Sequence, residues 1–118
     1  MPIKAILVGF GNVGRALLKE LFDSELSIEV VGAVSSRGGV LINDLDDLRT
    51  LYELAVNDLN LSRHPKFRIG LDISRLINHT KPDLAYIAIP PSYRIGEPNK
   101  SIYHELIDSG ISIITADK

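Results

Sequence analysis

The sequence contains no cysteine and no tryptophan, and aromatic residues make up only 6% of its 118 residues. Without cysteine, disulfide bonds, thiol catalysis and zinc sites built on thiolates are excluded. The three histidines, His64, His79 and His104, show no metal-ligand spacing. We therefore predict no metal site, and we expect each histidine at the surface or at a helix end.

A surplus of charge of either sign is also missing. Thirteen Lys and Arg residues against 15 Asp and Glu residues give a net charge of −2, and no basic run adjoins the aromatic residues. A nucleic-acid partner is therefore not expected. No apolar run is long enough to cross a membrane or to form a signal-peptide core, so we expect a cytoplasmic protein without a membrane partner. Residues 1–118 suffice for a single domain with one core.

Short apolar runs alternate with amphipathic stretches along the chain. Five strands are predicted, within residues 3–8, 27–36, 67–69, 82–89 and 111–115. Apolar residues spaced three or four apart predict helices between them, and the first helix is expected to place Arg15, Lys19 and Glu20 on its solvent side. The alternation predicts an α/β fold of the Rossmann type, a doubly wound parallel sheet with five strands in the order 3-2-1-4-5.

The first strand runs into Gly9, Gly11 and Gly14, which have the spacing G-x-G-x-x-G. Between a strand and a helix this pattern is typical of a nucleotide-binding loop, where glycine allows a tight turn and the close approach of a pyrophosphate. N–H groups at the helix start are expected to face the phosphates. The predicted cofactor-binding residues are Gly9, Phe10, Gly11, Asn12, Val13 and Gly14. The alternative is a tight strand-to-helix turn that binds nothing.

The end of the second strand is where a carboxylate would indicate NAD, because such an acid accepts hydrogen bonds from the ribose hydroxyls. The sequence there is SSRGGV, expected in a loop, and no carboxylate appears before Asp44. Ser35, Ser36 and Arg37 offer donors instead, which suit the 2′-phosphate of NADP. We predict that the cofactor is NADP or NAD, with NADP favoured. A polar turn without a ligand is the alternative.

A second loop, IPPSYRIGEP, follows the fourth predicted strand. In this fold, that position lies near the nicotinamide half of the cofactor. Pro90 is expected to stiffen the loop, and Ser92 is expected to donate a hydrogen bond to a ribose or phosphate oxygen. A stiff turn before a helix, without a ligand, explains the same residues equally well.

Four stretches, VGFGNVGRALL, VSSRGG, IPPSYRIGEPNKS and SGISIITADK, together resemble the N-terminal half of homoserine dehydrogenase. That family has a glycine loop like Phe10–Gly14, a Gly-Glu-Pro motif like Gly96–Pro98 and a Thr-Ala-Asn-Lys motif like Thr115–Lys118. The resemblance spans essentially the whole chain in the right order. It implies an oxidoreductase that interconverts L-aspartate 4-semialdehyde and L-homoserine with NAD(P)H, on the route to threonine and methionine.

The resemblance also implies a catalytic role for Lys118 beside the nicotinamide and the substrate, where an ammonium group binds a carboxylate or polarises a carbonyl. Asp117 stands where the family has Asn. The family's substrate and dimerisation region follows this motif. Residues 1–118 are thus expected to form the dinucleotide-binding domain and to be inactive alone. Full-length members are homo-oligomers, and an exposed sheet edge after the fifth strand predicts self-association.

Two other functions stay open on the sequence alone. One is a stand-alone nucleotide-binding or sensing module that a partner chain completes. The other is the first domain of a different NAD(P)-dependent dehydrogenase, which the GEP and TADK stretches disfavour by resemblance.

Overall fold

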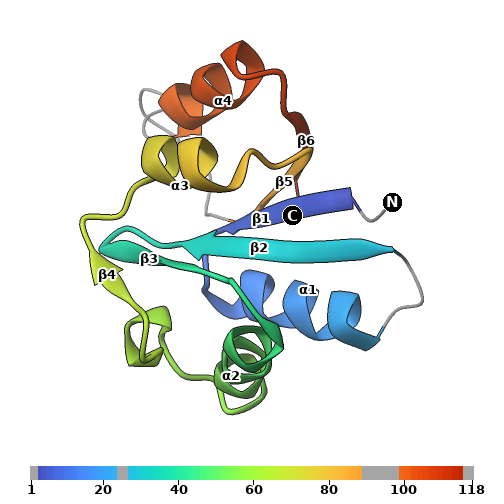
Figure 1. Cartoon of the computed structure of the whole chain (residues 1–118), viewed down its shortest axis with the longest axis vertical. Helices are drawn as coiled ribbons and strands as arrows, with labels where there is room; N and C mark the ends of the chain where they lie inside the picture. The colour runs from blue at the N-terminus through green and yellow to red at the C-terminus, as the bar shows by residue number, and fades with distance from the viewer. Residues whose placement is uncertain (1–2, 24–26, 89–98, 116–118) are drawn as a thin grey trace.

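The computed structural model describes residues 3–23, 27–88 and 99–115. A central sheet lies between two layers of helices (Figure 1). Helices α1 (Asn12–Asp23) and α2 (Leu45–Val56) cover one face, and α3 (Ile73–Thr80) and α4 (Asn99–Asp108) cover the other. A short 3₁₀ helix, η1 (Leu61–Arg63), follows α2. Among these helices, none is long and apolar enough to cross a membrane.

The sheet has six strands in the order β4-β3-β2-β1-β5-β6. The four strands β2, β1, β5 and β6 are parallel, whereas β3 pairs antiparallel with both of its neighbours. The strands are β1 (Ile3–Val8), β2 (Ile28–Val34), β3 (Gly38–Leu41), β4 (Arg68–Ile69), β5 (Leu84–Ile87) and β6 (Ser112–Thr115). The sheet is therefore mixed and mostly parallel.

The predicted strand order and the all-parallel sheet are wrong at one edge. β3 (residues 38–41) includes residues 38–40, which were expected in a loop, and it lies between the second and third predicted strands. Two bonds to the carbonyl oxygen of Gly38 close the turn, one from the N–H of Ser35 (2.8 Å) and one from its hydroxyl (3.2 Å). A Cβ at Gly38 would lie 2.1 Å from the carbonyl oxygen of Arg68, so glycine lets β4 approach.

The alternation of side chains along β1 divides the core between the two faces of the sheet. Ala5 and Leu7 pack with residues of α1 and α2, whereas Ile6 and Val8 pack with residues of α3 and α4. Both faces of β1 are thus covered from Ala5 to Val8, which explains why these four residues are all apolar, whereas Ile3 and Lys4 are exposed. The largest fully buried side chains on the covering helices are those of Leu18, Leu51, Leu76 and Leu106.

Each histidine lies at the surface or at a helix end, as predicted, and His64 is the C-cap residue of η1. His79 and His104 are exposed, but His64 is buried. The His64 Nε2 lies 3.0 Å from the carbonyl oxygen of Asp47, and its Nδ1 accepts a bond from the N–H of Lys66 (3.0 Å). Burial alone raises the pKa of the Asp47 carboxyl, but hydrogen bonds from Lys66 and Asn43 outweigh it and lower that pKa. These hydrogen bonds hold the segment after η1 against the start of α2.

Candidate functional site

The glycine loop lies where β1 ends and α1 begins, between the ends of two neighbouring strands. The N–H of Gly9 donates to the carbonyl oxygen of Val34 at the end of β2 (2.8 Å), and the N–H of Ala88 donates to that of Val8 (2.8 Å). The chain passes from β1 to β2 on one side, and β5 lies on the other (Figure 1). Open α/β sheets bind ligands at such a reversal of strand order, outside the carboxyl ends of the strands.

Two of the three motif glycines are required by the fold itself. Gly9 has a φ of 105°, a conformation that a side chain resists. A Cβ on Gly14 would lie 2.3 Å from the carbonyl oxygen of Gly9, so only glycine lets α1 start this close to β1. Both residues would be glycine in this turn whether or not a ligand binds.

Gly11 is different, because the fold gives no reason for glycine there. It does not adopt a left-handed φ, and a Cβ built on it meets no atom of the described chain within 4 Å. The residue is exposed and faces open space. Glycine at this position removes a side chain from the place where a pyrophosphate approaches the backbone.

The start of α1 presents free hydrogen-bond donors beside that open space. The first bond of this turn runs from the N–H of Arg15 to the carbonyl oxygen of Gly11 (2.9 Å). Within the described chain, the N–H groups of Asn12, Val13 and Gly14 have no acceptor, as expected for the first turn of a helix. The first turn also carries no acidic residue. Free N–H groups and the helix dipole together favour an anion here.

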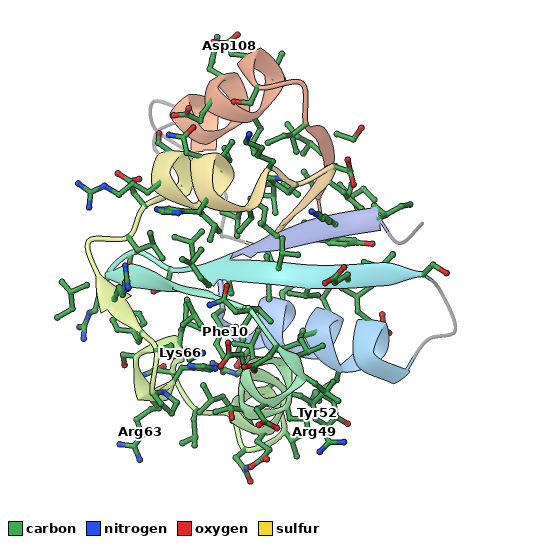
Figure 2. All side chains as sticks on the ribbon, viewed as in Figure 1. Phe10, Arg49, Tyr52, Arg63, Lys66 and Asp108 are labelled. Atoms are coloured by element: carbon green, nitrogen blue, oxygen red, sulfur yellow. The ribbon has the colours of Figure 1, made fainter. Side chains whose placement is uncertain are left out.

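Phe10 was predicted among the cofactor-binding residues, but its side chain is not available to a ligand. The Phe10 side chain is 5% exposed and packs in the core between the sheet and α2 (Figure 2). Its carbonyl and the following peptide remain part of the loop. Phe10 therefore anchors the loop by its apolar side chain and does not offer that side chain to a ligand.

Arg15 is the residue of this site that the sequence reasoning placed wrongly. It was expected on the solvent side of the helix, but it is 9% exposed. Its Nη1 donates to the carbonyl oxygen of Phe10 (3.0 Å) and its Nη2 to Oδ1 of Asn12 (2.7 Å), while its Nε lies 3.7 Å from a carboxylate oxygen of Asp58. The only sequence signal is its position directly after Gly14.

The three residues predicted at the end of β2 lie in the turn between β2 and β3. The Ser35 hydroxyl is already bonded to the carbonyl oxygen of Gly38, so it is a structural donor of the turn. Ser36 and Arg37 are exposed. Within the described residues the Arg37 side chain has no hydrogen-bond or ion-pair partner. Since the end of β2 bonds to Gly9, this turn and the glycine loop share one edge of the sheet.

The remaining predicted site residues lie outside the described residues. These are Pro90, Ser92 and Lys118, together with the Gly96–Pro98 stretch. Within the described ranges, no group of three or more His, Asp or Glu side chains is placed to hold a metal ion.

Comparison with known proteins identifies a relative of this chain, although no family model matches it. Homoserine dehydrogenase from Sulfurisphaera tokodaii is 31% identical over 119 aligned residues, which cover 98% of this chain and 34% of that protein. The chain matches the N-terminal, NAD(P)-binding region of homoserine dehydrogenase. The family resemblance predicted from the sequence is thus confirmed, and the chain spans about a third of the length of this homoserine dehydrogenase.

Solved homoserine dehydrogenases share the fold. Two structures of a hyperthermophilic archaeal enzyme in complex with NADPH, one of them a mutant, align with TM-scores of 0.74. Their sequence identities to this chain are 24% for the mutant and 21% for the other, and the alignments cover 100% of this chain and 36% of theirs. The Rossmann-like α/β class predicted from the sequence is confirmed by this likeness.

The different surroundings of Gly14 and Gly11 predict different effects of alanine on the stability of the fold. Gly14→Ala should lower the free energy of unfolding by about 1–3 kcal/mol, because its methyl group meets the carbonyl oxygen of Gly9. Gly11→Ala should change it by less than about 0.5 kcal/mol, because its methyl group meets nothing. Urea unfolding without nucleotide measures both. Equal losses in the two variants would mean that Gly11 also serves the fold.

Proposed function

We propose that this chain binds NADP(H) at the glycine loop, as the cofactor-binding domain of a homoserine dehydrogenase. The observation that carries the proposal is Gly11, an exposed glycine that the fold does not require and that borders free N–H groups. Archaeal relatives of the same fold were solved with NADPH. In a full-length homoserine dehydrogenase, the bound cofactor would supply the hydride for reduction of L-aspartate 4-semialdehyde to L-homoserine.

The pyrophosphate is proposed to lie over Gly11, against the start of α1. The N–H groups of Asn12, Val13 and Gly14 donate to its oxygens, and the helix dipole stabilises its negative charge. A side chain at position 11 would fill the space that the phosphate needs. The fold requirements on Gly9 and Gly14 set the position of these donors relative to the sheet.

NADP is proposed to be preferred over NAD because the turn after β2 offers a cation and no acid. Arg37 is exposed and its guanidinium matches the geometry of a 2′-phosphate, with Ser36 beside it as a second donor. An acid that would bind the ribose hydroxyls of NAD and repel the phosphate is missing from residues 35–39. Ser35 is not proposed to contact the 2′-phosphate, because its hydroxyl already donates to the carbonyl oxygen of Gly38 in the turn.

For these 118 residues we propose cofactor binding without turnover. The chain matches about a third of its relatives, and the resemblance assigns the substrate pocket and the proton-transfer residues to the remainder. Lys118 is proposed to lie on the nicotinamide side by that same resemblance. Self-association stays a prediction, supported by the position of β6 at the sheet edge with Ile114 45% exposed.

Titration calorimetry with NADPH tests the proposal. We expect the chain to bind NADPH, with affinity falling from the parent to Gly11→Ala and by about 100-fold or more in Gly11→Val, because a larger side chain excludes the phosphate. Thermal unfolding of each variant serves as the control for folding. A folded parent chain that binds no NADPH, or a Gly11→Val variant that binds it as tightly as the parent, would contradict the proposal.

Arg37→Ala should weaken NADPH binding by about tenfold or more and leave NADH binding unchanged, because it removes a charge-assisted bond to the 2′-phosphate. Calorimetry with both nucleotides measures the ratio. Arg63→Ala is the matched control, since it removes the same charge from an exposed position at η1 (Figure 2). A parallel loss for NADPH and NADH in Arg37→Ala would refute a 2′-phosphate contact.

A further inference from the structure

Arg15 is a buried cation directly beneath the glycine loop. Its guanidinium holds two groups of that loop, the carbonyl oxygen of Phe10 and the side-chain oxygen of Asn12. Its own N–H donates to the carbonyl oxygen of Gly11. Arg15 thus contacts the loop at three successive residues, and none of these contacts belongs to the sheet or to the packing between helices.

The bond to Phe10 sets the direction of the next N–H group. A peptide unit is planar and trans, so its C=O and N–H point in opposite directions. Because the carbonyl of Phe10 points at the buried Arg15, the N–H of Gly11 points away from it. Gly11 is exposed, and within the described chain no acceptor is bonded to its N–H.

This peptide joins Phe10 to Gly11, and glycine tolerates more backbone conformations than any other residue. A flip of the Phe10–Gly11 peptide would exchange its N–H for its carbonyl on the exposed side. An oxygen there would repel a phosphate that the N–H would otherwise bind. The two hydrogen bonds from Arg15 to Phe10 and Asn12 oppose that flip.

The fold alone gives Arg15 little reason to be an arginine. Within the described part of the chain, its Nε is buried without a hydrogen-bond partner. The one counter-charge found there, Asp58, is 3.7 Å away with its side chain 77% exposed. Burying a cation that is incompletely paired is costly, and apolar side chains of similar size often serve stability as well or better. Its positive charge is therefore only partly compensated at the start of α1.

We infer that Arg15 is a positioning residue for the phosphates of the dinucleotide. It holds the Phe10–Gly11 peptide with its carbonyl inward and its N–H outward, and its charge adds to that of the helix N-terminus. This inference rests on the proposed cofactor site at the glycine loop. Arg15 then raises the affinity for the pyrophosphate without being needed for the stability of the fold.

Two substitutions separate these roles. Arg15→Met keeps much of the apolar stem of the side chain but removes its charge and its hydrogen-bond donors. Arg15→Lys keeps the charge but lacks the planar guanidinium that donates to two acceptors at once. The midpoint of thermal unfolding without nucleotide should fall little or rise in Arg15→Met. Its dissociation constant for NADPH should increase about tenfold or more, and that of Arg15→Lys by an intermediate factor.

A backbone measurement adds a readout that a purely structural role would not move. In the parent, the amide resonance of Gly11 should shift on addition of NADPH, and in Arg15→Met it should shift less at equal saturation. Equal affinities and equal Gly11 shifts in parent and variants would overturn the role of Arg15 while leaving the cofactor site standing. A folded parent that binds no NADPH would overturn the cofactor site, and the inference with it.

Discussion

The structure of the site depends on the contact between Gly14 and the carbonyl oxygen of Gly9. Because position 14 carries no side chain, α1 begins directly against the end of β1. Bonds from Gly9 to Val34, and from Ala88 to Val8, hold that end between the neighbouring strands. The N-terminus of the helix is thus fixed at the point where the strand order reverses, and its free N–H groups face outward as a consequence of the packing.

The three glycines and one arginine of this loop meet different physical demands. Gly9 and Gly14 satisfy the backbone and the packing, whereas Gly11 leaves a space that the folded chain does not use. Arg15 is buried with one nitrogen unsatisfied, which is a cost to the fold. An unused space and an incompletely paired cation lie at one helix terminus, and the proposed binding of a phosphate would account for both. Stability alone accounts for neither.

The sequence predicts those features that follow from periodicity, and misses those set by contacts between distant backbone atoms. The apolar run of β1 and the change of period after Gly11 were sufficient to predict the strand, the helix and the loop between them. Strand β3 was missed because Gly38 and Gly39 indicate a turn, although here glycine admits the carbonyl oxygens of neighbouring strands. The burial of Arg15 and His64 was missed for a related reason: their partners include main-chain groups, which no residue pattern displays.

The central claim is that the negative charge of a dinucleotide binds at the start of α1. Titrating the isotope-labelled chain with NADPH while recording the amide nuclear magnetic resonance spectrum tests it most directly. The account predicts that the largest shifts fall on the amides of residues 11–14 and that those of α3, on the opposite face, stay nearly unchanged. Saturable binding that leaves the amides of residues 11–14 unshifted would contradict it.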